Sequence, residues 1–171
     1  MVKFKHPNSF SNPSPIVIPQ VGATGNAAPF PASIEVRNQT SSIKKVTVTI
    51  RNLVHSFPAD IHMLLIGPQG QSAYLMGNIG NSFSINGVTI TFDDAALNML
   101  PTATPLVSGT YRPTLFGPAD SDLPNTIFGS NTSLSVFEGT NPNGVWTLYV
   151  LDALADDTGF ISDGWTLTIY S

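Results

Sequence analysis

Apolar and polar residues alternate one by one along much of this chain, and this period constrains the fold more than any other feature. In residues 46–50, Val and Ile alternate with Thr47 and Thr49, and residues 88–92, 144–152 and 165–170 repeat the pattern. A period of two places successive side chains on opposite faces of a β-strand. Residues 61–66 are nearly all apolar, so they predict a central strand covered on both faces.

Turn-forming residues separate these segments. The chain has 14 Gly and 14 Pro, and such residues interrupt regular structure. Only residues 94–100 suggest a helical turn, and residues 116–132 are too long for a hairpin loop, so we expect them to cross the surface. The pattern predicts an all-β, jelly-roll-type β-sandwich of about nine or ten strands.

Composition narrows the classes of function. The 171 residues suit one domain, and only 11% are charged, with a net charge of −4. The surface is therefore expected to be rich in Ser, Thr, Asn and Gln, and nucleic acid is not an expected partner. The absence of Cys excludes disulfides, thiol catalysis and cysteine-ligated zinc. No apolar run is long enough to predict a membrane span.

The tripeptide Asp157-Thr158-Gly159 matches the signature of aspartic proteases. That chemistry requires two carboxylates sharing one proton, and the chain has no second Asp-Thr-Gly or Asp-Ser-Gly. We therefore predict a turn, in which Gly159 supplies a positive φ and a strand begins at Phe160. No Gly-x-Ser-x-Gly segment is present either, so we predict that the chain is not an enzyme.

The C-terminal third resembles the P domain, also called the Homo B domain, of proprotein convertases and bacterial subtilisin-like proteases. Family-like pieces upstream extend the resemblance over residues 14–171, and Ala59 replaces a Gly common in the family. No protease domain accompanies the match. The motifs that carry the resemblance are Leu134 with Phe137, residues 143–150 (NGVWTLYV), Asp152, residues 157–159 and Trp165 with Leu167.

The resemblance implies a non-catalytic, extracellular structural or interaction module of β-sandwich type. In the convertases this module packs against the protease and stabilises it. Here the expected partner is a second copy, an absent protease or a cell-surface protein. The first ten residues lack a signal peptide's apolar run, so secretion would require a leader removed beforehand. The alternative is a calcium- or carbohydrate-binding module appended to a secreted hydrolase.

Calcium binding is the metal hypothesis. Calcium prefers carboxylate and carbonyl oxygens, and several Asp residues follow predicted strands. The candidate ligands are Asp60, Asp93, Asp152 and Asp157, and the competing interpretation is that they only form turns. The His residues lack a metal-binding spacing, so we expect His55 and His62 to be structural.

Carbohydrate binding would require exposed aromatic side chains. Trp146 and Trp165 alternate with polar residues, so we expect both to lie in the core, on neighbouring strands. The four Tyr residues are scattered along the sequence.

The N-terminal arm, residues 1–13, precedes the family-like region. Val2, Phe4 and His6 alternate with two Lys residues, which suits an edge strand, and a Pro-rich tether follows. An edge strand can pair with its own domain or with a neighbouring copy. A head-to-tail exchange would give a homo-oligomeric ring or a filament. The alternative is a disordered terminus.

Overall fold

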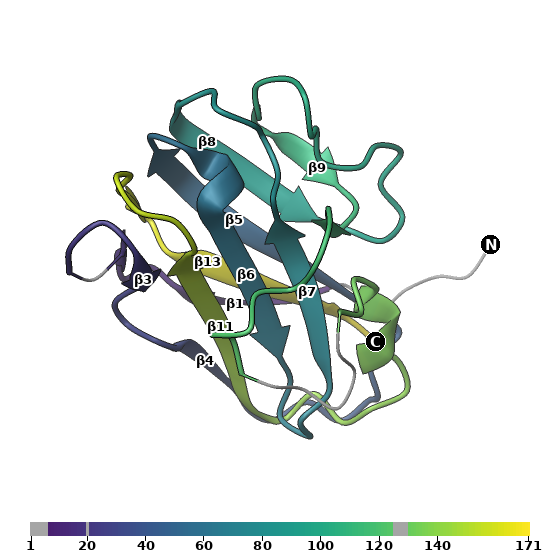
Figure 1. Cartoon of the computed structure of the whole chain (residues 1–171). Helices are drawn as coiled ribbons and strands as arrows, with labels where there is room; N and C mark the ends of the chain where they lie inside the picture. Colours follow the sequence, from purple (N-terminus) through teal and green to yellow (C-terminus); the bar gives the residue numbers. More distant parts are fainter. Residues whose placement is uncertain (1–6, 20, 125–129) are drawn as a thin grey trace.

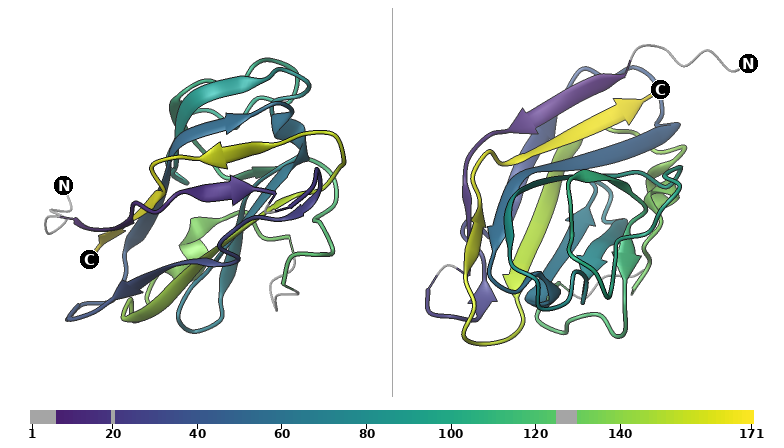
Figure 2. Two further views of the ribbon diagram at one scale, coloured as in Figure 1. Left: turned by 90° about the vertical axis from the view of Figure 1, so that its left-hand side faces the viewer. Right: turned by 90° about the horizontal axis from the view of Figure 1, so that it is seen from above.

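The fold is a sandwich of two β-sheets, which confirms the predicted all-β class. The computed structural model describes residues 7–19, 21–124 and 130–171. Figure 1 shows β6, β7 and β11 in front of β5, β13 and β1, and Figure 2 shows the two layers from the side and from above. No helix in the described residues is long and apolar enough to cross a membrane.

The first sheet has seven strands arranged around the long strand β5. β5 pairs with β13 along its first half and with β12 at its end, while β8 lies along its other edge. Among the described strands of this sheet, β8 and β9 form the one parallel pair. The strands are β1 (Asn8–Asn12), β2 (Ile16–Ile18), β5 (Lys45–His55), β8 (Ile85–Phe92), β9 (Gly109–Tyr111), β12 (Gly159–Ile161) and β13 (Trp165–Tyr170).

The second sheet has six strands, with β6 and β11 at its centre. Two short 3-10 helices, η1 (Pro58–Asp60) and η2 (Leu134–Phe137), lie outside the sheets. Residues 94–100, predicted to form a helical turn, contain no helix; they form a non-helical turn at 94–95 and an isolated bridge at Met99. The strands are β3 (Gly25–Asn26), β4 (Ala32–Val36), β6 (Ile61–Ile66), β7 (Ser72–Gly77), β10 (Thr114–Leu115) and β11 (Gly144–Asp152).

The structure has more strands than the nine or ten expected from sequence. The excess comes from short strands, since β3 and β10 have two residues and β2, β9 and β12 have three. A segment of this length is too short to show a two-residue period, so only pairing with a longer neighbour defines it as a strand.

The core lies between the sheets and contains both Trp side chains. Trp146 in β11 is 0% exposed and Trp165 in β13 is 1% exposed, which confirms their predicted burial. The prediction that they lie on neighbouring strands is wrong, because β11 and β13 belong to opposite sheets. The Trp146 indole packs against Phe137 at 4.8 Å between ring centroids and donates a hydrogen bond to the Pro142 carbonyl at 2.9 Å.

Hydroxyl groups line the outer face of the seven-stranded sheet. Ser11 and Thr166 are joined at 2.8 Å, and Thr49 and Thr91 at 2.9 Å, each pair lying on adjacent strands. This face is one place where the predicted Ser- and Thr-rich surface forms.

The outer face of the six-stranded sheet is covered by the described parts of residues 116–132, as predicted. Leu123, 5% exposed, belongs to a second apolar cluster with Leu64, Tyr74 and Leu151. The Asp120 amide donates to the Tyr74 hydroxyl at 3.0 Å. Strand β6 is therefore buried on both sides, as its apolar sequence predicted.

The N-terminal strand β1 forms one edge of the seven-stranded sheet. It pairs antiparallel with β13, from Asn8 opposite Ile169 to Asn12 opposite Trp165. The edge strand predicted for Val2, Phe4 and His6 lies outside the described residues. Residues 8–12 of the predicted arm thus join their own chain's sheet.

Candidate functional site

A buried His–Asp pair joins the two sheets at one end of the sandwich. His55 is the last residue of β5 in the seven-stranded sheet, and Asp152 is the last residue of β11 in the six-stranded sheet. The His55 Nε2 atom lies 3.1 Å from the Asp152 Oδ2 atom, and neither side chain has exposed surface. The pair therefore connects the layers through a contact that solvent does not reach.

Both nitrogens of the His55 ring have hydrogen-bond partners. The Phe57 amide donates to Nδ1 at 3.1 Å, so the neutral ring carries its proton on Nε2 and donates to Asp152. Burial lowers the pKa of His55. The neutral ring and the carboxylate are thus the expected forms near neutral pH, and no ring nitrogen remains available to activate a nucleophile.

Two further carboxylates lie in the electrostatic field of this pair. Burial, followed by the charges of Asp152 and Asp157, raises the pKa of Asp60 to about 6. Burial also raises the pKa of Asp152 to about 6, with Asp157 adding to the shift and the Leu154 amide opposing it. We call His55, Asp60, Asp152 and Asp157 the interlayer cluster.

Gly159 leaves room for the His55 ring. A Cβ atom at this position would collide with the Val54 carbonyl and the His55 side chain. Gly159 is the first residue of β12 and does not have a positive φ; that conformation occurs at Asp156, with φ 84°. A turn is present at residues 155–156, just before the predicted tripeptide, and the strand begins at Gly159 rather than at Phe160. The reason predicted for Gly159 is wrong, because close packing rather than turn geometry requires a glycine there.

The predicted calcium ligands are divided between two places. Asp60, Asp152 and Asp157 belong to the interlayer cluster, whereas Asp93 follows β8 and forms an ion pair with Lys45 at 2.8 Å. Within the described part of the chain, no three His, Cys, Asp or Glu side chains are arranged to hold a metal ion.

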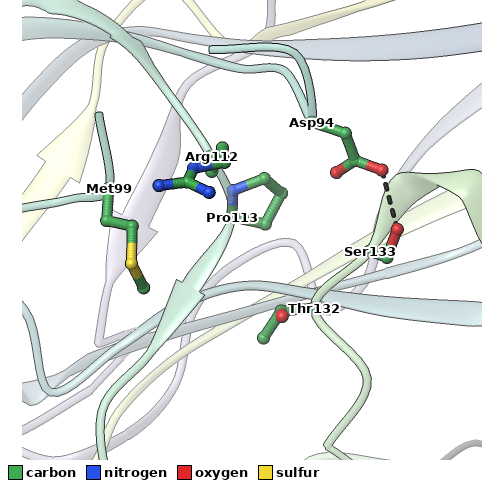
Figure 3. A pocket seen from close by; sticks show the side chains of 6 residues that line it. All are labelled: Asp94, Met99, Arg112, Pro113, Thr132 and Ser133. Carbon is green, nitrogen blue, oxygen red and sulfur yellow. Dashed lines mark hydrogen bonds between the residues drawn. The ribbon is translucent and has the colours of Figure 1, made fainter. Parts of the chain in front are cut away.

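The second polar region is a surface pocket of about 270 Å³ formed by the β8–β9 connection, the residues between β9 and β10, and the segment before η2. Its lining residues are Asp94, Met99, Arg112, Pro113, Thr132 and Ser133. Figure 3 shows Asp94 and Ser133 on one side and the Arg112 guanidinium beside Met99 on the other. We call this the Arg112 pocket.

Asp94 fixes one wall of the Arg112 pocket. Its Oδ2 atom accepts hydrogen bonds from the Ser133 hydroxyl at 2.8 Å and the Ser135 amide at 2.9 Å, and its Oδ1 atom accepts from the Leu134 amide at 3.0 Å. The carboxylate thus holds the start of η2. Sequence reasoning missed this role, because Asp94 and Ser133 are 39 residues apart.

An apolar hollow of about 510 Å³ lies near the interlayer cluster, over β2, β12 and the end of β5. Its lining includes Val17, Val54 and Phe160 and borders His55. The His55 side chain has no exposed surface, so the hollow does not open onto the ring.

The other expected structural His, His62, also has a partner inside the protein. Its Nδ1 atom lies 3.0 Å from the Tyr74 hydroxyl, and burial lowers the pKa of His62.

Comparison with known proteins does not assign a role to these sites, since no protein-family model and no characterised protein matches the chain.

Proposed function

We propose that this chain is a non-catalytic structural and interaction module of P-domain type that acts outside the cytoplasm by contacting another protein. The motifs around Trp146, Asp152 and Trp165 support the family, and the β-sandwich architecture agrees with it. The partner is a second copy, an absent protease or a surface protein.

One observation carries the proposal. The strongest candidate for acid–base chemistry, the His55–Asp152 pair, is closed to solvent and hydrogen-bonded at both ring nitrogens. A general base must come within hydrogen-bond reach of its substrate, and this ring lacks such an approach. The pair instead links β5 to β11, which is a structural role.

Calcium binding is the second candidate. Three of the four predicted ligands share the interlayer cluster, and the mutual repulsion of its carboxylates contributes to the raised pKa of Asp60. A bound cation would relieve this repulsion. The burial of Asp60 and Asp152, at 5% and 1% exposure, weighs against this candidate.

The test compares turnover with stability in His55→Gln. We expect the wild-type chain to hydrolyse neither casein nor simple ester substrates above background. The variant is expected to unfold at a lower temperature, because it loses a contact between the sheets. Turnover by the wild type that disappears in a still-folded His55→Gln chain would refute the non-catalytic role.

A further inference from the structure

We propose that the Arg112 pocket is a docking point for an acidic side chain of a partner protein. This inference rests on the proposed interaction role and adds the chemistry of the contact. The ligand is an Asp or Glu carboxylate on a protein surface, with apolar neighbours that pack beside Met99.

Within the described part of the chain, the Arg112 guanidinium forms no ion pair with a carboxylate. Among the described residues, the ion pairs are Arg37 with Glu35, Lys45 with Asp93 and His55 with Asp152. Arg112 takes part in none of them, although the chain as a whole is acidic, with a net charge of −4. A planar guanidinium can bind a carboxylate through two parallel hydrogen bonds.

Asp94, the acidic residue in the pocket, does not supply a counter-charge to the Arg112 guanidinium. Asp94 already accepts three hydrogen bonds from residues 133–135, through both of its oxygens. It is directed toward Ser133, away from the guanidinium (Figure 3). An incoming carboxylate can therefore reach Arg112 from the side of Met99.

The backbone around Arg112 is held in place before any partner arrives. The Arg112 amide donates to the Asn98 carbonyl at 2.9 Å, and the Arg112 carbonyl accepts from the Thr114 hydroxyl at 2.8 Å. Met99 and Arg112 also form an isolated parallel β-bridge. Preorganisation of this kind reduces the entropy lost on binding.

Exposed apolar side chains lie beside Arg112 on the β8–β9 connection. Met99 is 54% exposed, and Leu97, two residues earlier, is 87% exposed. Arg and Met are enriched in protein interfaces, where an Arg often acts as an anchor. A single cation with apolar neighbours is suited to an acidic side chain within an otherwise apolar contact, rather than to a polyanion.

The test uses two capped peptides, one with a central Glu flanked by Leu and one with Gln in its place. Amide chemical shifts of the full chain are followed by NMR during titration. We expect the Glu peptide to give saturable shifts at Met99, Arg112 and Thr132. The Gln peptide should bind about tenfold more weakly, because it lacks the charge-assisted hydrogen bonds.

Variants locate the contact. Arg112→Gln should reduce binding of the Glu peptide to the level of the Gln peptide, and Arg37→Gln, which removes the same charge elsewhere, should leave it unchanged. Equal binding of both peptides, or unchanged binding to Arg112→Gln, would overturn the proposal. Acetate binding as tightly as the Glu peptide would also overturn it, because the site would then recognise anions in general. Substrate turnover would refute the proposed function without altering these results.

Discussion

The interlayer cluster and the Arg112 pocket both combine a carboxylate with a nitrogen-containing side chain. They differ in the burial of these side chains and in whether the two groups bond to each other. In the interlayer cluster, His55 and Asp152 are buried and bonded to each other. In the Arg112 pocket, Asp94 is bonded to the backbone and Arg112 remains open to solvent. The first arrangement joins two sheets, whereas the second leaves a charge available for binding.

The difference shows that polar composition alone does not identify a binding site. A buried polar group must find its partner within the protein, because leaving it unpaired is costly. An exposed cation is solvated by water and can exchange that water for a ligand. The two regions therefore differ in whether their polar side chains have hydrogen-bond or ion-pair partners within the protein. Residue type alone does not distinguish the structural interlayer cluster from the candidate interface at the Arg112 pocket.

The largest expected difference is in stability. Asp152→Ala leaves the Nε2 proton of buried His55 unpaired, so we expect a loss of about 3 kcal/mol in the free energy of unfolding. Asp94→Ala removes hydrogen bonds from a half-buried site and should cost about 1 kcal/mol. Urea denaturation measures both, with Asp122→Ala as an exposed control. Equal losses for Asp152→Ala and Asp94→Ala would contradict the distinction.

The pH dependence of stability sharpens the same comparison. The pKa of Asp60 is about 6 in the folded chain, above its usual unfolded value, so the folded state binds this proton more tightly. The resulting stabilisation is complete below about pH 4 and is lost as pH rises through about 6. The lowered pKa of His55 acts in the opposite sense, since its contribution is lost as pH falls below its ordinary value.

The Asp60→Asn variant separates the pH-dependent contribution of Asp60 to stability from that of His55. The amide stays neutral, so we expect the variant to exceed the wild type in stability at neutral pH by on the order of 1 kcal/mol. The advantage should disappear in acid, where Asp60 of the wild type is protonated. Denaturation curves across this range provide the measurement. A constant difference between the two chains would show that Asp60 does not titrate with the raised pKa.

Arg112→Gln should have almost no effect on folding. Arg112 has no ion-pair partner among the described residues, and substitutions of this kind usually change stability by less than about 0.5 kcal/mol. Its stability should follow the pH profile of the wild type. A loss as large as that of Asp152→Ala would mean that Arg112 is structural, and the contrast between the two regions would fail.

Calcium is expected to have the smallest effect. The described carboxylates do not form a ligand set, so we expect the melting temperature to be the same in millimolar calcium and after prolonged chelation. An increase in calcium that disappears in Asp157→Asn would instead support the calcium-binding alternative. A ligand at one hundred times its Kd contributes about 2.7 kcal/mol, which thermal denaturation resolves easily.

Self-association through the N-terminal arm stays a prediction. Light scattering of the full chain and of a chain without residues 1–6 measures it directly. Strand β1 is left intact by this truncation, so a change in mass would come from the terminus itself.

The sequence by itself determined the longer strands and much of the composition of the core. Alternation around Thr47 and Thr49 predicts one inward and one outward face, and Val46, Val48 and Ile50 are buried as expected, although Thr47 is buried too. The continuous apolar run in residues 61–66 predicts burial on both faces, which is observed. These properties depend on neighbouring residues in one strand, so a local pattern contains them. The burial of Trp146 and Trp165 follows from the same periodicity.

Only the tertiary structure decided which polar side chains meet. His55 and Asp152 are 97 residues apart, and Asp94 and Ser133 are 39 apart. Their contacts depend on the order of strands in each sheet and on how one sheet lies over the other, which a two-residue period does not specify. For the same reason, the sequence placed Trp146 and Trp165 on neighbouring strands, whereas the structure places them in opposite sheets. Local hydrophobic patterns specify which face of a strand is buried, but topology determines what that face contacts.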